Sequence, residues 1–279
     1  MAEQLLIAVQ NFFSDIQYPG HTISADQEPA GYEAWRVGTA RRHLLNRWQA
    51  TTANADHYLK VDCGAGVTRA TTFVAIDRES NHVGKRFLLD SSPDNSTWTN
   101  VFDCTVPSSA SGTPAGANGC LTDEGAWLKT FTTATARYFR LTSKAMGAGI
   151  VPQLTGVWLS LAYQPTDGVL YYPLDDDRYD LAFDAVTSPY GWTGRSRVAR
   201  VRTGTVSIKL MGTTDEAQLR TDIMSLYARG YPAWICWQKT DRPTAALLGH
   251  VPAGSLALAR TDSWPFRTLD IPFVEEQPA

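Results

Sequence analysis

The sequence predicts a mainly β protein: an N-terminal β-sandwich or jelly roll, followed by a β-sandwich or split barrel that carries one α-helix. Two observations lead to this fold class. Residues 57–163 contain seven or eight short apolar segments separated by turn residues, with no helical pattern between them. Residues 204–238 have the pattern of a strand, a capped helix and a second strand. Because the turn-rich segment 164–168 separates the two patterns, we expect domains at residues 1–165 and 166–279.

The N-terminal strands are predicted from short apolar segments and from the turn residues that separate them. Residues 5–9 are apolar, but they are too few for a membrane span and lack the basic flank of a signal peptide, so we expect a first strand there. Residues 10–56 are rich in turn residues in their first half and predict a long, ordered loop region. Further strands are expected at residues 57–64, 71–76, 86–89, 98–102, 127–132, 137–142 and 157–163.

The C-terminal elements centre on the predicted helix. Residues 206–210 alternate as a half-buried strand does. Thr213 and Glu216 have the spacing of a capping box, and Gly230 and Pro232 stop a helix of about residues 214–229. The next strand, residues 233–238, is apolar on both faces. The remaining strands are expected at residues 245–250, 255–260 and 268–274, where Pro272 predicts an edge strand.

Composition excludes several classes of protein. The chain has 279 residues, 43% of them hydrophobic and 19% charged, which is typical of a globular protein large enough to bury a core in each domain. The formal net charge of −3 gives no reason to expect nucleic acid as a partner, and no segment predicts membrane insertion. Cys104 and Cys120 flank a loop rich in Ser, Gly, Pro and Ala and could form a disulfide; the alternative is four reduced, mostly buried thiols.

The sequence predicts no enzyme. It has no H-E-x-x-H motif, no C-x-x-C pair, no G-x-S-x-G turn and no Walker loop, so we expect neither catalytic residues nor a cofactor. A pair of glycosidase carboxylates has no spacing signature and stays an alternative. The run Asp175–Asp177 offers oxygen atoms for calcium, but its spacing fits a solvated turn better, so no metal site is predicted.

Three segments of the N-terminal half resemble those of discoidin-like (galactose-binding-like) domains. YLKVDCG at residues 58–64 resembles their hydrophobic strand that ends in D-L-G. LDSSPDNSTW at 89–98 resembles their S-x-D-G-x-x-W hairpin, and ARYFRL at 136–141 resembles their A-R-Y-V-R-L strand. The resemblance implies a β-sandwich over about residues 10–163.

Ligands of discoidin-like domains commonly bind in the loops that correspond to residues 10–56. The aromatic rings and guanidinium groups in this region suit stacking and hydrogen bonding to a sugar, which makes a host surface glycan the expected ligand. The alternative is that Trp35 and Trp48 pack in the core or between domains. The candidate ligand-binding residues are Tyr32, Trp35, Arg36, Arg41 and Arg42.

The C-terminal half resembles the ring-forming belt domain of the distal tail proteins of long-tailed bacteriophages. The order of an arginine-bearing strand, a helix opening TTDEAQLR, a Trp-rich strand and a closing LDIPFVE carries this resemblance over about residues 168–276. It implies a ring of six copies at the tail tip of a virion, assembled in the host cytoplasm, that joins the tail tube to the tail hub or baseplate. The candidate interface residues are Arg195, Arg197, Arg200, Arg202, Trp234 and Trp237.

Two other functions stay open. In one, the chain is a glycan-binding receptor-binding protein whose C-terminal half attaches it to a larger particle. In the other, it is the accessory carbohydrate-binding module of a carbohydrate-active enzyme. In both, the sandwich is the functional part.

Overall fold

The computed structural model describes residues 5–38, 46–78, 80–164, 169–171, 179–187, 193–210, 231–236, 243–250, 258–260 and 267–275. These residues form antiparallel strands and two short 3-10 helices, η1 (Ala34–Gly38) and η3 (Pro243–Ala245), which confirms the mainly β class. The helix expected at about residues 214–229 lies outside the described residues. Within the described part, no helix is long and apolar enough to span a membrane.

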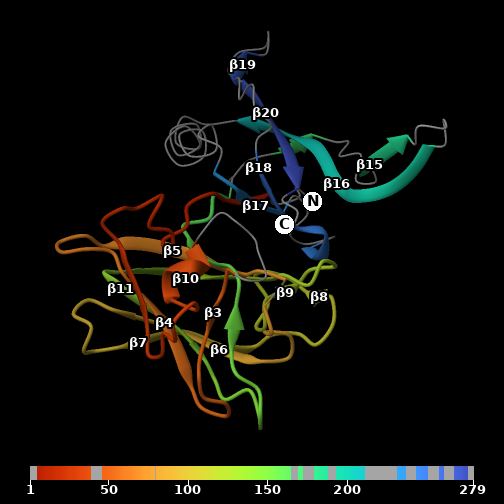
Figure 1. Ribbon diagram of the computed structural model, residues 1–279. Coiled ribbons are helices and arrows are strands. Elements are labelled where there is room, and N and C mark those ends of the chain that lie inside the picture. The colour runs from red at the N-terminus through yellow and green to blue at the C-terminus, as the bar shows by residue number, and fades with distance from the viewer. Residues whose placement is uncertain are drawn as a thin grey trace.

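The N-terminal half is a two-layer sandwich (Figure 1). Its first sheet has the order β2–β4–β11–β6–β7, and its second has the order β13–β5–β10–β9–β8. A separate two-stranded sheet pairs β3 (Trp48–Gln49) with β12 (Gln153–Leu154). The strands of the two main sheets are β2 (Thr22–Ala25), β4 (His57–Asp62), β11 (Tyr138–Ser143), β6 (Arg86–Ser92), β7 (Thr99–Thr105), β13 (Val157–Ser160), β5 (Arg69–Ile76), β10 (Trp127–Ala136), β9 (Cys120–Leu121) and β8 (Ser111–Gly112).

The sandwich core forms because alternate residues of each strand face the opposite sheet. In β4 the exposure alternates residue by residue, with His57, Leu59 and Val61 buried and the residues between them half-buried. Both sheets contribute to one continuous cluster, and burying each large apolar side chain contributes about 1.5–3 kcal/mol to stability. This cluster includes Leu59, Val61, Phe87, Leu89, Phe139 and Leu141 from one sheet and Val74, Ile76, Trp127, Val157 and Leu159 from the other.

The C-terminal half adds an eight-stranded sheet with the order β1–β17–β18–β20–β16–β14, in which β15 pairs with β16 and β19 with β20. The first strand of the chain belongs to this sheet: Leu6–Ala8 (β1) pairs with Trp234–Cys236 of β17. On its other side, Ile7 exchanges two backbone hydrogen bonds with Tyr163, of 2.8 and 3.0 Å. The remaining strands are β14 (Val169–Tyr171), β15 (Tyr179–Thr187), β16 (Thr193–Leu210), β17 (Ala233–Cys236), β18 (Leu247–His250), β19 (Leu258–Arg260) and β20 (Arg267–Glu275).

The edge-strand prediction for residues 268–274 is wrong. β20 pairs with β16 on one side and with both β19 and β18 on the other. Pro272 is tolerated in an inner strand because it lies between the residues paired with β19, which end at Leu269, and those paired with β18, which begin at Val274.

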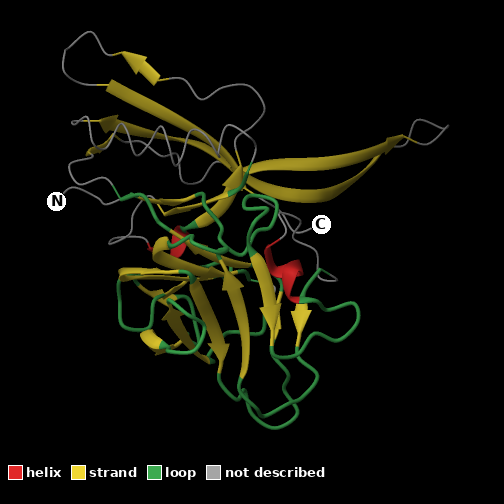
Figure 2. Ribbon diagram, turned by 90° about the vertical axis from the view of Figure 1, so that its left-hand side faces the viewer, coloured by secondary structure: helices red, strands yellow, loops and turns green. Residues whose placement is uncertain are grey.

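Strand β16 is far longer than the predicted strand at residues 206–210. Residues 203–210 pair with β20 inside the sheet, whereas residues 193–202 pair with β15 beyond the sheet. This second part is a two-stranded ribbon that reaches away from the body of the molecule (Figures 1 and 2). We call residues 179–187 and 193–202 the ribbon.

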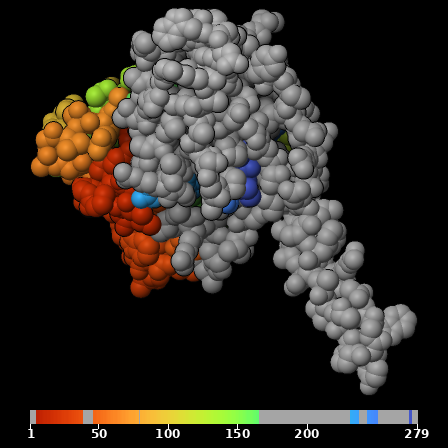
Figure 3. All heavy atoms as spheres, turned by 90° about the horizontal axis from the view of Figure 1, so that it is seen from above, coloured from red at the N-terminus to blue at the C-terminus, as the bar shows by residue number. Residues whose placement is uncertain are grey.

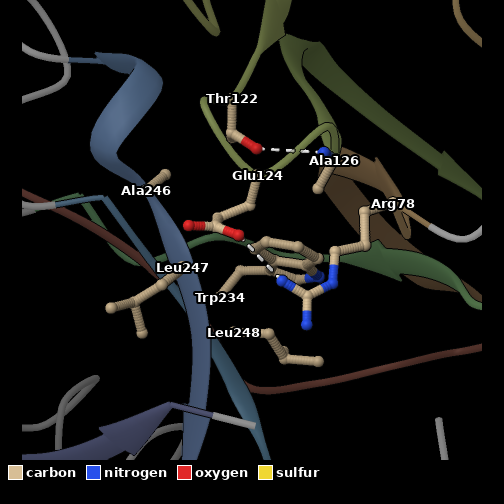
Figure 4. A pocket seen from close by; sticks show the side chains of 8 residues that line it. All are labelled: Arg78, Thr122, Glu124, Ala126, Trp234, Ala246, Leu247 and Leu248. Atoms are coloured by element: carbon tan, nitrogen blue, oxygen red, sulfur yellow. Dashed lines mark hydrogen bonds and ion pairs between the residues drawn. The ribbon is translucent and has the colours of Figure 1, made fainter. Parts of the chain in front are cut away.

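A second apolar cluster joins the sandwich to the eight-stranded sheet. Trp158 of β13 and Trp234 of β17 meet edge to face, with ring centroids 6.3 Å apart. At one border of the cluster, the Arg78 guanidinium donates to the Glu124 carboxylate over 2.9 Å, beside Trp234 and Leu248 (Figure 4). The Asp123 amide also donates to the carbonyl of Thr244 over 2.9 Å. The halves are therefore joined by buried apolar contacts and by backbone hydrogen bonds.

Candidate functional site

A tight turn and the η1 helix position the candidate ligand-binding residues. The Tyr32 amide donates to the carbonyl of Pro29, and Gly31 between them has a φ of 87°, which glycine adopts without strain. In η1, Ala34 and Val37 are fully buried while Trp35 faces outward. Gly38 allows the end of η1 to pack directly on the backbone at Phe13, because a Cβ at residue 38 would lie only 1.6 Å from the carbonyl oxygen of Phe13.

Trp35 is the exposed aromatic residue of this region. Its side chain is 44% exposed, and the Arg36 guanidinium carbon lies 5.1 Å from its ring centroid, a cation–π distance. Arg36 is held by Glu33, whose Oε2 accepts from Nε over 2.6 Å. The hydrogen bond from Arg36, followed by those from the amides of Glu33 and Gly31, lowers the pKa of Glu33 to about 2. The pair is therefore charged at neutral pH.

Tyr32 and Trp48 have different environments. Tyr32 is half-buried, and the Arg47 guanidinium lies over its ring, 5.4 Å from the centroid. Trp48 is fully buried in the sandwich core, and its Nε1 donates to the carbonyl of Gln27 over 2.8 Å. The core-packing interpretation therefore holds for Trp48, whereas Trp35 lies at the surface.

Trp35 borders an open hollow of about 480 Å³, which is also lined by Asp15, His21, Thr22 and Ile23. His21 is 8% exposed and stacks on Tyr18, with ring centroids 4.6 Å apart. Burial lowers the pKa of His21, so the ring is neutral at pH 7. The carbonyl of Phe12 accepts from Nδ1 over 3.0 Å, while Nε2 is itself buried, so the ring lines the hollow without offering it a free nitrogen.

The hollow therefore combines an indole surface with a carboxylate, a hydroxyl and an imidazole. This is the combination by which proteins hold a sugar: stacking against its apolar face and hydrogen bonds to its hydroxyl groups. The N-terminal segment that carries these residues forms an exposed face on one side of the molecule (red and orange in Figure 3). Asp15, His21 and Thr22 had no motif that could mark them in the sequence, and Arg47 was marked only by its place beside Trp48.

The other predicted site residues are placed as follows. The structure brings Tyr32, Trp35 and Arg36 into one short segment, while Arg41 and Arg42 lie outside the described residues. Trp237 also lies outside them, and Trp234 is 1% exposed, packed within the chain against Trp158. The backbone of β16 includes Arg195, Arg197, Arg200 and Arg202.

A second aromatic and basic cluster lies on the outer face of the first sheet. The Arg140 guanidinium carbon lies 4.2 Å from the ring centroid of Trp98 and 5.7 Å from that of Tyr58. Its Nη2 donates to Asp90 over 3.0 Å, and Asp90 also accepts from Asn100 over 3.1 Å. Asp90 already pairs with the charge of Arg140, and Arg140 already stacks on the ring of Trp98. The cluster therefore stabilises the sheet, and the hollow at Trp35 is the better candidate site.

The structure offers no thiol or metal chemistry in its described part. All four cysteines are free and buried, so Cys104 and Cys120 are not bridged. Burial raises the pKa of Cys104 to about 11 and that of Cys120 to about 12, which keeps both as neutral thiols. Within the described residues, no group of three or more His, Cys, Asp or Glu side chains is arranged to hold a metal ion.

Comparison with known proteins finds similarity only among solved structures: no protein-family profile and no curated protein matches the chain. One similar structure is the chitosan-binding module 1 of a chitosanase/glucanase from Paenibacillus sp. IK-5, at 19% identity and a TM-score of 0.39, covering 54% of this chain and 98% of the module. Another is CpGH89CBM32-5 from Clostridium perfringens, in complex with GalNAc-β-1,3-galactose, at 11% identity and a TM-score of 0.39, covering 51% of this chain and 96% of that module.

A third similar structure is a GH29 fucosidase of Ruminococcus gnavus in complex with fucose, at 13% identity and a TM-score of 0.41. The similarity covers 55% of this chain but spans only 27% of the fucosidase. Identities and TM-scores this low carry no inference about ligands. The sandwich is established by its own strand pairing and core.

Proposed function

We propose that this chain binds carbohydrate through the hollow beside Trp35. The observation that carries the proposal is an exposed tryptophan, fixed by a buried helical turn, at the rim of a hollow lined by Asp15, His21 and Thr22. Stacking on the C–H face of a pyranose ring removes the apolar surface of an exposed indole from water, which favours binding. The carboxylate of Asp15 and the hydroxyl of Thr22 then orient the sugar through its hydroxyl groups. The expected ligand is a neutral glycan on a cell surface.

The test is binding of the full chain to a glycan array, followed by calorimetry with the best ligand. Trp35→Ala should weaken the affinity about tenfold or more, because the stacking surface is lost. Trp98→Ala is the matched control: it removes a tryptophan outside the hollow and should leave the affinity within about twofold. If the chain binds no glycan on the array, or if Trp35→Ala and the unmodified chain have equal affinities, this function is refuted.

A second candidate function is structural: a ring of six copies at a phage tail tip that joins the tail tube to the hub. The sequence resemblance of the C-terminal half supports it, together with one feature of the eight-stranded sheet. In the described part, β14 ends the sheet order and pairs with β16 on one side only. An open edge can accept a strand from a neighbouring copy, and a contact between two different surfaces closes into a ring when its rotation allows.

Light scattering coupled to size-exclusion chromatography tests the ring. A ring of six copies has a mass of about six times 30.7 kDa. A proline substituted at Leu170 of β14 should release monomers if this edge forms the contact. A monomer at every concentration, both alone and mixed with tail-tube protein, would rule out the structural role.

A further inference from the structure

The pairing register of the ribbon places all four of its arginines on one face. Directly opposite residues in an antiparallel pair share a face. The pairs are Tyr179 with Arg202, Leu181 with Arg200, Phe183 with Arg197, and Ala185 with Arg195. In β15 these partners are every second residue, so they all belong to the same face.

A β-bulge makes this alignment possible. Arg197 and Arg200 are three residues apart, and an odd spacing would place them on opposite faces of a regular strand. The register shifts between Ala182 and Phe183, so that Val198 has no directly opposite residue. The extra residue restores the alternation, which brings Arg195 and Arg197 to the face of Arg200 and Arg202.

The two faces of the ribbon differ in charge. Each arginine stands opposite an uncharged residue, and none of the ten residues that share this face in the described ribbon is acidic. Asp180 and Asp184 belong to the other face, where they stand opposite Val201 and Ser196. Arginines at alternate positions lie about 7 Å apart along a strand, close enough to repel one another unless an anion lies over them.

We propose that this arginine face binds an acidic polysaccharide. The four positions follow the strand for about 20 Å, so they match an extended polymer with repeated anionic groups rather than a single ion. The guanidinium fork pairs with carboxylates through two parallel hydrogen bonds. Tyr179 and Phe183 at positions on the same face add aromatic surface of the kind that stacks on sugar rings.

The ribbon site is separate from the hollow at Trp35, so the two proposals fail independently. Trp35→Ala should leave polyanion binding unchanged, and loss of the ribbon arginines should leave neutral-glycan binding unchanged. The ribbon projects from the body, so a long polymer can reach it without displacing the eight-stranded sheet (Figure 2).

The experiment measures binding of the full chain to polygalacturonate, with dextran as the neutral polymer. Replacing Arg195, Arg197, Arg200 and Arg202 by serine should weaken polygalacturonate binding at least about tenfold, and raising NaCl from about 0.05 M to about 0.5 M should weaken binding of the unmodified chain similarly. The sharper variant combines Ser196→Arg, Arg197→Ser, Arg200→Val and Val201→Arg, because it keeps the number of arginines and the net charge but moves two arginines to the other face. It should weaken binding about fivefold or more.

Asp180→Asn with Asp184→Asn is the control on the opposite face and should not weaken binding. Circular dichroism and dextran binding of every variant separate lost folding from lost recognition. Equal binding of dextran, or full affinity in the four-serine variant, would overturn the proposal. So would tighter arginine-dependent binding of duplex DNA, or arginine-dependent self-association that polygalacturonate does not disrupt, because each assigns the face to a different partner.

Discussion

Arg36 lies over the ring of Trp35, with its guanidinium carbon 5.1 Å from the ring centroid, while its Nε donates to Glu33. Cation and ring are thus stacked before a ligand arrives. Preorganised contacts reduce the conformational entropy that binding has to offset. The geometry of the proposed sugar site therefore depends on Glu33, a residue that does not line the hollow itself.

Glu33→Gln should weaken glycan affinity several-fold at pH 7 without unfolding the protein, because Arg36 loses its charged partner while Trp35 stays. The pKa of Glu33 is lowered from 4.5 to about 2, so in the folded protein the carboxylate keeps its charge, and its contribution to glycan affinity through Arg36, until the pH falls towards 2. Calorimetry of both proteins at several pH values checks this. Unchanged affinity in Glu33→Gln would show that Trp35 acts without a fixed Arg36.

His82 should make the fold less stable as the pH falls. It is fully buried, and burial lowers its pKa from 6.5 to about 4. Between these values the unfolded chain binds a proton that the folded chain does not, so stability rises with pH in this window, by about 3 kcal/mol at most. Urea unfolding at about pH 7 and pH 4.5 measures the difference, which should shrink in His82→Gln. The lowered pKa of His21 acts with the same sign and leaves a residual slope.

Trp234→Ala should destabilise the protein by about 3–5 kcal/mol, because it empties the buried contact with Trp158 between the two halves. Trp234→Phe keeps an aromatic ring there and should lose less. Trp35→Ala, at an exposed tryptophan, is the matched control and should stay within about 0.5 kcal/mol. Denaturant unfolding followed by fluorescence compares the three, and a small loss for Trp234→Ala would mean that the halves fold independently.

Lys129→Met should loosen the loop at residues 113–119. The buried ammonium donates to the carbonyls of Gly116 and Ala117 over 3.0 and 2.9 Å, and burial lowers its pKa. Methionine has a similar shape but leaves both carbonyls without this donor, at a cost of about 1–3 kcal/mol. Limited proteolysis should cut the loop faster in this variant. Lys144→Met, which removes an exposed ion pair with Asp56, should not change the cleavage rate.

The sandwich could be predicted because each of its strands buries one face, which places apolar residues at every second position of the sequence. The strands expected at 57–64, 127–132 and 137–142 were located to within a few residues. An arginine-bearing strand was expected ahead of residues 206–210, and the structure contains it as the ribbon part of β16. Its pairing with β15 was not predicted, because a two-stranded ribbon outside the sheet needs no alternation of apolar residues.

The residues of the candidate site could be predicted only in part. Trp35 and Arg36 stand together in the sequence and were identified from their chemistry. Asp15, His21 and Thr22 reach the same hollow through the path of the loop region, and no spacing rule describes such a path. Pairing between strands far apart in the sequence could not be predicted either. Residues 5–9 were correctly predicted to contain a strand, but their sequence does not identify β17 as its partner.

The pairing of β1 with β17 has a consequence for synthesis. The partner strand ends at Cys236, so a nascent chain carries Leu6–Ala8 without β17 for on the order of ten seconds or more. The sandwich can close around its own core, and Tyr163 can pair with Ile7, well before then. β1 is therefore synthesised long before the strand that completes its pairing.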